Sequence, residues 1–488
     1  MYIGVDLGTS AVKLLAMNKD GTILKTVSVE YPISFPQSGW SEQNPEDWYK
    51  GSMEGISKLI AETGETTVEG IGVGGQMHGL VILDKDDNVI RPAILWNDGR
   101  TTEETDYLNN VIGKDKLSQY TGNIAFAGFT APKVLWVKNN EPENFAKIEK
   151  IMLPKDYLVY RLTGAYSSDY SDASGMLLMD VEHKCWSKEM MEICGISHIT
   201  MPELHESFDV VGSVKSDICS ELGISGDVKV VAGAGDNAAA AVGTGTVGPG
   251  KCNLSLGTSG TIFITSDKFS VDDKNSLHAF AHADGGYHLM GCMLSAASCN
   301  KWFMDEILRD SEYSANQKKI DVNKLGENNV FFLPYLMGER SPHNDPLVRA
   351  CFLGMSMDTK REDMLQAVLE GVAYGLRDSL EVARSLGIEI TTSNICGGGN
   401  KSPLWRKIMA NVMNIKLEIQ ENDEGPALGG AILAAVGCGD FESVNAAAEK
   451  IVNVVEVVEP DPELVAKYEE GYKAFKKLYP IVKDIWRR

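Results

Sequence analysis

Apolar and polar residues alternate over the first thirty residues of the chain. A period of two predicts half-buried strands, and the pair Asp20-Gly21 favours a tight turn between two of them. Residues 1–30 are therefore expected to form a meander of strands. The apolar positions of the pattern are Val5, Val12, Leu14, Ala16, Ile23, Val27 and Val29.

Two further apolar runs end in glycine, at residues 68–75 and 228–235. A third run, Ser393 to Cys396, leads into Gly397, Gly398 and Gly399. We interpret all three as buried strands, because short apolar runs bounded by glycine are typical of a sheet interior. Helical stretches separate these strands, which indicates an α/β architecture.

A long amphipathic helix is predicted from about residue 360 to 385. Thr359 and Glu362 have the spacing of a capping box. Ser402-Pro403 predicts a second helix start, and residues 459–488 are expected to be helical. The apolar stripe of the long helix consists of Leu365, Val368, Leu369, Val372, Leu376 and Leu380.

The sequence Leu-Gly-Thr-Ser occurs twice, at residues 7–10 and 256–259, about half a chain length apart. Each copy follows a predicted short strand. A tight Gly-Thr-Ser turn exposes backbone N–H groups and hydroxyls, which are the groups that a phosphate oxygen needs. The repeat predicts two related lobes, each offering a phosphate loop to a shared cleft. The glycine-rich stretch 243–250 places their boundary, with lobes at residues 1–245 and 246–488.

Length and charge narrow the class of protein. A chain of 488 residues exceeds one ordinary core, so two domains are expected. Its 68 acidic against 46 basic residues give a formal charge of −22. A chain this acidic repels nucleic acid and anionic lipid, so neither is an expected partner. No uncharged apolar run reaches membrane-spanning length, so no membrane span is expected, and the first residues do not predict a signal peptide.

The nine cysteines are odd in number, scattered and never spaced as Cys-x-x-Cys. This pattern favours free thiols in a reducing compartment, so a cytoplasmic location is expected. The eight histidines have no ligand-like spacing, and no zinc site is predicted.

Two aspartates follow glycine-punctuated strands. Asp6 closes the first strand beside the first phosphate loop, where it would hold Mg²⁺ or, alternatively, satisfy turn amides. Asp236 precedes Asn237 and a run of alanines, where it would serve as a helix N-cap or as a general base toward a hydroxyl that attacks the γ-phosphate of ATP.

Two polar segments are candidates for binding a polyol. Gln76, Met77 and His78 follow a Gly-Gly strand end, although a single histidine is more often structural. The segment Trp96 to Arg100 is either one wall of a sugar site or a turn with an arginine ion pair.

The ordered series of motifs resembles the FGGY family of carbohydrate kinases, nearly end to end as far as about residue 436. Within that family it is similar to the branch that acts on xylulose. The segments that carry the resemblance are Ser41 to Gln43, Gln76 to Gly79, Ile94 to Arg100, Gly128 to Lys133, Leu153 to Tyr157, Gly235 to Ala239, Ser255 to Gly260, Leu333 to Leu336, Gly338 to Arg340 and Gly397 to Gly399.

The resemblance implies a two-lobed actin-like ATPase (ribonuclease H-like) fold with a cleft between duplicated domains. It also implies Mg²⁺-dependent and ATP-dependent phosphorylation of D-xylulose to D-xylulose 5-phosphate in pentose catabolism. A homodimer is expected at the level of the family. One departure is Ser341, where the xylulose branch usually has threonine; the hydroxyl is kept. The Arg-Glu pair that glycerol kinases have near Met77 is missing, which argues against glycerol.

Carried over by position, the resemblance makes Asp236 the catalytic base and Asp6 the metal-proximal aspartate, with both near the metal. The expected sugar contacts are Gln76, Met77, His78, Trp96, Asp236 and Asn237. The expected ATP contacts are Gly8, Thr9, Ser10 and Lys13 in the first lobe. In the second lobe they are Gly257, Thr258 and Ser259 in the phosphate loop and Gly398, Gly399 and Asn400 in the adenosine-binding segment.

Three alternatives stay open at this stage. In the first, the chain is a sugar kinase for another ketose or polyol, such as L-xylulose, ribulose or a deoxy-xylulose. In the second, it is a non-enzymatic ATP-driven module like actin or the Hsp70 ATPase, which share the fold. In the third, it is an inactive sugar sensor, an alternative that the intact Asp6, Asp236 and phosphate loops disfavour.

Overall fold

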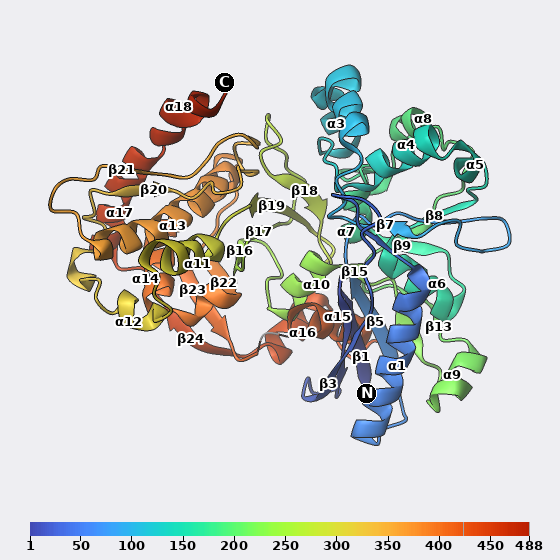
Figure 1. Ribbon diagram of the computed structural model, residues 1–488. Helices are drawn as coiled ribbons and strands as arrows, with labels where there is room; N and C mark the ends of the chain where they lie inside the picture. The colour runs from blue at the N-terminus through green and yellow to red at the C-terminus, as the bar shows by residue number, and fades with distance from the viewer. Residues whose placement is uncertain (423, 488) are drawn as a thin grey trace.

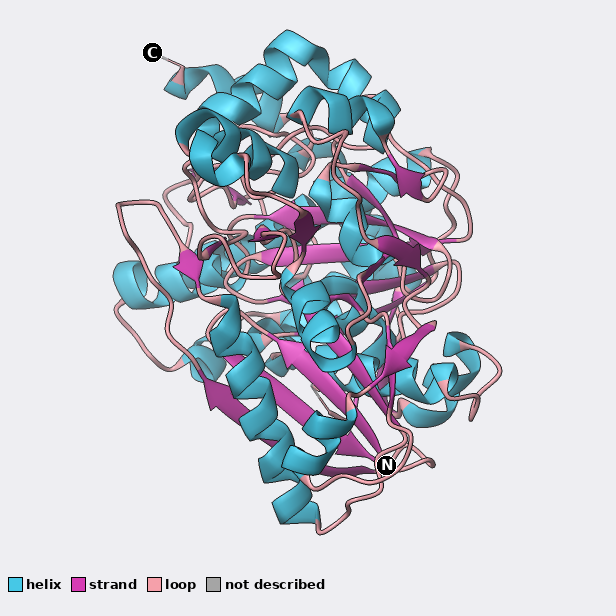
Figure 2. Ribbon diagram, turned by 90° about the vertical axis from the view of Figure 1, so that its right-hand side faces the viewer, coloured by secondary structure: helices cyan, strands magenta, loops and turns pink. Residues whose placement is uncertain are grey.

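The computed structural model describes residues 1–422 and 424–487 and has two lobes, each built on a seven-stranded sheet (Figures 1 and 2). The first sheet has the order β13-β14-β5-β1-β2-β3, with β15 paired to β5. Its strands are β1 (Tyr2–Leu7), β2 (Ala11–Met17), β3 (Ile23–Glu30), β5 (Gly70–Gly75), β13 (Val210–Ser213), β14 (Lys229–Val231) and β15 (Ala234–Gly235).

The second sheet has the order β18-β19-β17-β16-β22-β23-β24. Its strands are β16 (Lys251–Leu256), β17 (Gly260–Ser266), β18 (His278–Ala281), β19 (Tyr287–Met293), β22 (Thr392–Cys396), β23 (Lys416–Gln420) and β24 (Val454–Val458).

The two sheets repeat one topology. In the first, β1, β2 and β3 form an antiparallel meander while β5 and β14 run parallel to β1. In the second, β16, β17 and β19 form the antiparallel part, and β22 and β23 run parallel to β16. Each Leu-Gly-Thr-Ser copy therefore forms the hairpin loop after the central strand of its sheet. The predicted α/β fold, the meander and the duplicated lobes are confirmed.

Helices cover both sheets (Figure 2). The longer ones are α1 (Pro45–Thr63), α3 (Lys114–Thr121), α4 (Thr130–Asn140), α6 (Pro154–Thr163), α8 (Lys188–Cys194), α9 (Ser216–Leu222), α10 (Asp236–Gly243), α13 (Arg361–Ser385), α14 (Pro403–Met413), α15 (Gly425–Gly437), α16 (Val444–Ile451) and α17 (Pro462–Phe475). Ser402 caps α14 through its hydroxyl, as predicted. The predicted helical tail consists of α17, α18 (Leu478–Val482) and a 3₁₀ turn (Lys483–Trp486); Arg488 lies outside the described residues.

One crossing links the lobes. Helices α15 and α16 lie in sequence between β23 and β24 of the second sheet, but α15 packs on β1 and β5 of the first sheet (Figure 1). Side chains of α15 and α16 share one buried cluster with Tyr2, Leu15 and Ala234. The division of the chain at residues 245 and 246 stays a prediction, and the segment 425–451 lies against the first lobe.

Three local predictions are wrong. The run 228–235 is not one strand, because the chain breaks at Gly233, where φ is 82° and a Cβ would lie 2.1 Å from Val73 O. The predicted long helix is present as α13, but its capping box is not Thr359 with Glu362: Asp363 accepts from the Lys360 N–H at 2.8 Å, and Thr359 accepts from the Ser356 N–H. Asp236 is the first residue of α10 rather than its N-cap, which is Gly235.

A buried acid on α13 gives a stability prediction. Glu370 is 4% exposed, and its Oε1 accepts from Gln366 Nε2 at 2.8 Å and Tyr468 OH at 3.0 Å. Burial raises the pKa of Glu370 to about 7. The folded chain thus holds this proton at pH values where the unfolded chain has lost it, so stability falls as pH rises from about 4.5 to 7.

Glu370→Gln is expected to remove this pH dependence. The variant gains up to about 3 kcal/mol over the parent at pH 8 and little at pH 5, as urea unfolding at both pH values would measure. Glu362→Gln, half-buried on the same helix, is the control and should follow the parent. An equal offset of Glu370→Gln at both pH values would contradict the prediction.

Candidate active site

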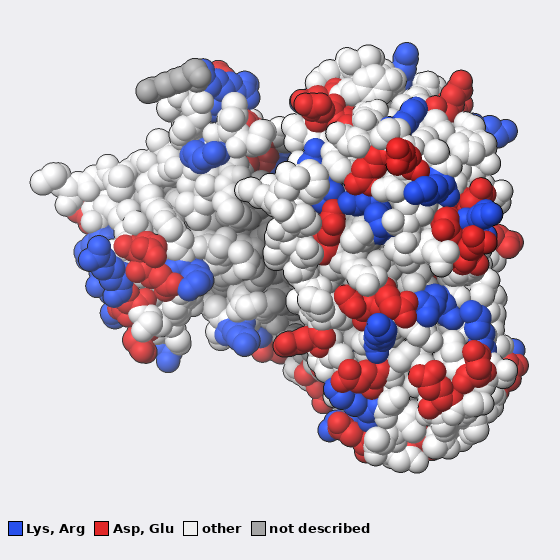
Figure 3. Space-filling model, turned by 45° about the vertical axis from the view of Figure 1, so that its right-hand side comes forward, with Lys and Arg blue, Asp and Glu red and all other residues white. Residues whose placement is uncertain are grey.

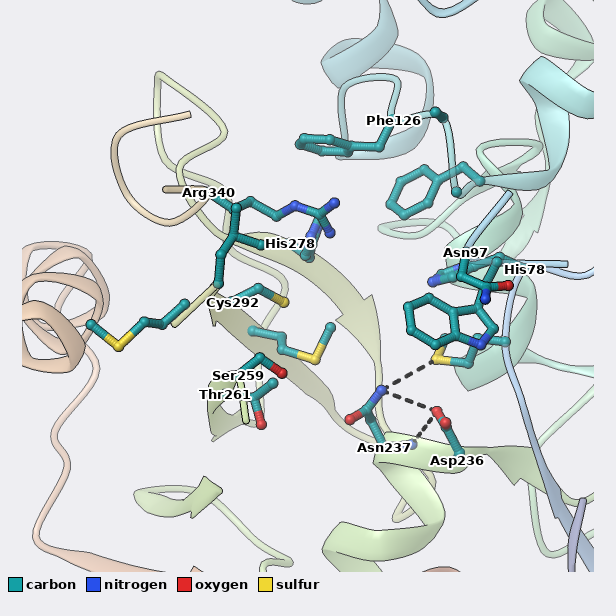
Figure 4. A pocket seen from close by; sticks show the side chains of 18 of the residues that line it. His78, Asn97, Phe126, Asp236, Asn237, Ser259, Thr261, His278, Cys292 and Arg340 are labelled. Atoms are coloured by element: carbon teal, nitrogen blue, oxygen red, sulfur yellow. Dashed lines mark hydrogen bonds between the residues drawn. The ribbon is translucent and has the colours of Figure 1, made fainter. Parts of the chain in front are cut away.

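A cavity of about 470 Å³ lies between the lobes (Figure 4). It contains five of the predicted sugar contacts, and Ser259 of the second phosphate loop reaches its edge. The first lobe lines it with Met77, His78, Trp96, Asn97, Asp98, Phe126, Ala127, Gly128, Phe129, Asp236 and Asn237. The second lobe lines it with Ser259, Gly260, Thr261, His278, Met290, Cys292, Met293, Leu294 and Arg340.

Asp236 lies in this cavity at the N-terminus of α10. Its Oδ1 accepts from the Asn237 N–H at 2.7 Å and from Asn237 Nδ2 at 3.0 Å. Its Oδ2 receives no hydrogen bond from the described residues, so this oxygen is free to accept from a bound hydroxyl. Burial raises the pKa of Asp236 to about 6, and the hydrogen bond from Asn237 opposes the rise. A half-buried carboxylate of this kind suits general-base chemistry near neutral pH.

His78 lines the same cavity as Asp236, and its backbone and ring are both held in place. Its backbone adopts φ 68°, a conformation that is rare outside glycine. Lys133 Nζ and Thr130 Oγ1 donate to its carbonyl at 2.7 and 3.1 Å, and its Nδ1 lies 2.8 Å from Gly175 O. Burial, aided by the Lys133 charge, lowers the pKa of His78 to about 3. The ring is therefore neutral and offers Nε2 for hydrogen bonding.

Gln76 does not line the cavity. It is 2% exposed, and its Nε2 donates to Gly8 O at 3.3 Å and to Gln43 Oε1 at 3.0 Å. It thus supports the first phosphate loop from behind. Its predicted contact with the sugar stays a prediction, for which the geometry offers no direct route.

The first phosphate loop, residues 8–10, has its carbonyls occupied, while the amides of Thr9 and Ser10 are free. Tyr31 OH donates to Gly8 O, and Gln43 Nε2 donates to Thr9 O at 2.7 Å. Trp96 Nε1 donates to Thr9 Oγ1 at 3.0 Å. No acceptor among the described residues takes the N–H groups of Thr9 and Ser10. Free amides in a fixed turn are suited to phosphate oxygens.

The second loop, residues 257–259, repeats this arrangement. The N–H groups of Ala297 and Ala296 donate to Gly257 O at 2.9 Å and to Thr258 O at 3.0 Å. In the described part of the chain, the amides of residues 257–259 have no backbone or side-chain acceptor. Both halves of the repeat therefore present the same feature, an amide-lined turn.

The glycine segment predicted to bind adenosine adjoins this loop. Gly397 has φ 85°, and a Cβ there would lie 2.7 Å from the Leu256 carbonyl carbon. A Cβ at Gly398 would meet nothing within 4 Å, so its surface is open. Asn400 Oδ1 is buried, and none of the described residues donates to it. An open glycine surface with one unpartnered amide oxygen fits a flat ligand that carries a donor.

Asp6 lies within electrostatic reach of Asp236. Burial, and then the Asp236 charge, raise the pKa of Asp6 to about 7, while Lys13 opposes the rise. No described residue donates a hydrogen bond to the Asp6 carboxylate, so the alternative that it satisfies turn amides is wrong.

Lys13, an expected ATP contact, pairs with Glu424 at 2.6 Å. No set of three or more His, Cys, Asp or Glu groups with metal-site geometry occurs in residues 1–422 and 424–487. Mg²⁺ commonly takes one or two protein carboxylates and completes its coordination with phosphates and water, so the carboxylates of Asp6 and Asp236 fit a Mg²⁺ site.

The Trp96 to Arg100 segment supports both of its interpretations. Arg100 pairs with Asp98 at 2.7 Å and with Glu42 at 2.8 Å, and its guanidinium lies 3.7 Å from the Trp40 ring centroid. This ion pair fixes the turn, and Trp96, at 48% exposed, then stands at the cavity wall.

Sequence reasoning missed several lining residues. Phe126 and Arg340 face each other, with the guanidinium 5.0 Å from the ring centroid. Phe129 and Arg340 belong to motifs that signalled the family but were given no role. His278 lies in β18 without any sequence signal, and only the fold brings it beside Phe126 (Figure 4).

Comparison with known proteins agrees with this geometry. The N-terminal domain of the FGGY family of carbohydrate kinases matches residues 1–243, and the C-terminal domain matches residues 252–438. The chain is 38% identical to a xylulose kinase of Bacillus subtilis over 99% of its length and 97% of the relative's. It is also 38% identical to a xylulose kinase of Escherichia coli, with 98% of both chains covered.

Among solved structures, a xyloylose kinase from Brucella ovis superposes with a TM-score of 0.94 at 38% identity, covering 99% of both chains. The fold is thus the two-domain actin-like ATPase fold. Across the described residues, no helix combines the length and apolarity needed to cross a bilayer. The non-enzymatic ATP-driven module is excluded by the family match. The chain belongs to the FGGY family of carbohydrate kinases, which phosphorylate sugars.

Proposed function

We propose that the chain transfers the γ-phosphoryl group of ATP to the terminal hydroxyl of D-xylulose, giving D-xylulose 5-phosphate. The observation that carries the proposal is the free Oδ2 of Asp236 in a cavity that Ser259 of the second amide-lined loop also lines. Relatives named xylulose kinase at 38% identity over nearly the full chain support the choice of sugar.

Asp236 acts as the general base. Its Oδ2 accepts the proton of the attacking hydroxyl as the new O–P bond forms, while Asn237 holds Oδ1 in place. His78 and Trp96 orient the carbon chain by hydrogen bonding and contact. Phosphoryl transfer depends mainly on such positioning and on charge stabilisation.

The amides of Thr9 and Ser10 and those of residues 257–259 bind the phosphates from opposite lobes. Mg²⁺, when bound beside Asp6, would neutralise phosphate charge. Because the ligands come from two lobes, closure of the lobes completes the site and excludes water. On the face shown in Figure 3, acidic and basic side chains are interspersed, so local groups rather than a broad positive field must attract the nucleotide.

The identity of the product tests this proposal. The chain is incubated with Mg-ATP and D-xylulose, and ³¹P NMR of the product should show one new phosphomonoester coupled to the C5 protons. A phosphate ester at another carbon, or ADP formation without a sugar phosphate, would contradict it.

The expected homodimer and the expected cytoplasmic location stay predictions. Sedimentation velocity tests the oligomeric state.

Sugar phosphorylation is expected to fall at acid pH. The base must be ionised, and the pKa of Asp236 lies at about 6 in the ligand-free chain. Below this pH the carboxyl is protonated, so kcat/KM for the sugar should drop about tenfold per pH unit. Initial rates from pH 5 to 8, with ADP measured directly, check this. Activity recovered on return to pH 7.5 controls for denaturation; a flat profile down to pH 5 would contradict it.

A further inference from the structure

A buried ion network lies behind the strand end that carries Asp236. Lys155 Nζ is 2.6 Å from Asp156 Oδ1 and 2.8 Å from Asp169 Oδ1. All three residues are at most 1% exposed. Lys155 and Asp156 open α6, within a motif that signalled the family but has no part in the mechanism above. Asp169 ends β9 (Ser167–Asp169).

The first lobe makes room for this lysine with two glycines. A Cβ at Gly75 would lie 2.8 Å from Lys155 Cβ, and a Cβ at Gly233 would lie 3.3 Å from Lys155 Cδ. Gly75 ends β5 and Gly233 breaks the chain between β14 and β15. The lysine side chain therefore lies where these two strand ends meet.

The network binds the backbone that leads to Asp236. Lys155 Nζ donates to Ala232 O at 3.1 Å. The Gly235 N–H, one residue before Asp236, donates to Ser171 Oγ at 3.2 Å. The Gly233 N–H donates to Ser207 O at 3.0 Å. The strand end thus depends on side chains from other elements for its register.

Asp169 connects these contacts. Its Oδ1 faces Lys155, while its Oδ2 accepts from Ser171 Oγ at 2.5 Å and from Ser207 Oγ at 2.9 Å. Because the Ser171 hydroxyl gives its proton to Asp169, its lone pairs are left to accept from Gly235. Lysine, aspartate and serine therefore form one chain of contacts that ends at the residue before the base.

Stability alone gives a weak reason for this arrangement. Burying ions costs desolvation, and apolar residues of equal volume are often as stabilising. Asp172 adds a further buried carboxyl, which receives no hydrogen bond from the described residues. Such a costly cluster is better explained if it fixes a geometry that the chemistry needs.

We propose that the Lys155–Asp169–Ser171 chain sets the orientation of the Asp236 carboxylate, with Ser171 as a positioning residue. The inference rests on the proposed base role of Asp236. Removing the Ser171 hydroxyl lets Gly235 shift, which changes the direction of Asp236 Oδ2 and lowers the rate of transfer. Sugar contacts made by Met77 and His78 stay in place.

A double-mutant cycle tests this inference. Ser171→Ala, Asp236→Asn and the double variant are compared by steady-state kinetics with Mg-ATP and D-xylulose. Ser171→Ala is expected to lower kcat about tenfold with KM for the sugar within about twofold, since small misplacements of a reacting group mainly slow the reaction. In the Asp236→Asn background the same change should cost less than about twofold. Ser167→Ala removes a buried hydroxyl without a partner among the described residues and is the matched control.

The outcomes separate the inference from the function on which it rests. Near-parental kcat in Asp236→Asn would overturn the base role itself. With that role intact, an unchanged kcat in Ser171→Ala, a loss confined to KM, or the same loss in both backgrounds would overturn the positioning role. If Ser171→Ala does not fold, Ser171→Cys, which keeps the volume but accepts hydrogen bonds weakly, takes its place in the cycle.

Discussion

Asp236→Asn is expected to lower kcat for sugar phosphorylation by about 10²–10⁴-fold, the usual contribution of a general base. Asparagine keeps the size of the side chain and its bonds to Asn237, but it cannot accept the hydroxyl proton. Sugar affinity should change little, because the other cavity residues remain. The variant should also unfold at no lower temperature at pH 8, since it removes a carboxyl whose ionisation burial disfavours.

Turnover and binding must be measured separately. Initial rates give kcat, and isothermal titration with D-xylulose gives the dissociation constant. Asp227→Asn, on an exposed turn where the carboxylate pairs with Lys229, is the control and should keep parental turnover. Parental kcat in Asp236→Asn would remove this residue from the base role, whereas loss of sugar binding alone would make it a binding residue only.

The second large effect concerns the crossing of α10 and α15. A Cβ at Gly429 would lie 1.9 Å from Ala239 O, and a Cβ at Gly243 would lie 1.9 Å from Gly425 O. Backbone atoms cannot yield as side-chain ends do. Gly429→Ala should therefore force the helices apart and cost about 3 kcal/mol or more in unfolding free energy. Because α10 begins at Asp236, the surviving folded protein should also lose turnover.

Gly425→Ala is a matched control on the same helix. Its new Cβ would meet Ala240 at 3.4 Å, an ordinary contact, so stability and rate should stay near parental values. Urea unfolding followed by fluorescence, and kcat at 25 °C, measure both effects. Equal stability of the two variants would mean that the crossing adapts more easily than its backbone distances imply.

The duplicated architecture could be predicted because the features that indicate it are short patterns of residues close together in the sequence. The two Leu-Gly-Thr-Ser turns, the alternating meander and the apolar stripe of α13 each depend on near neighbours in sequence. The exact first and last residues of the helices could be predicted less well. The Lys360 N–H is capped by Asp363 rather than by the expected pair, because Thr359 is engaged in the preceding turn with Ser356.

The site was predicted only as far as motifs reach. Met77, His78, Trp96, Asp236 and Asn237 meet in one cavity, as expected. Gln76 points instead toward the Gly8 carbonyl, to which its Nε2 donates, whereas its neighbour Met77 lines the cavity. His278 and the return of α15 to the first sheet depend on long-range packing, which no local pattern encodes.

The specificity of phosphoryl transfer tests the central claim most directly. Values of kcat/KM are measured by ADP release with Mg-ATP and D-xylulose, L-xylulose, D-ribulose, L-ribulose or glycerol. The account predicts fast turnover with D-xylulose and a kcat/KM at least about tenfold above that of every other sugar, a difference of about 1.4 kcal/mol in transition-state binding. Preference for another sugar would leave the ATP loops and Asp236 in their roles but overturn the substrate, and no turnover with any of the five would contradict the account itself.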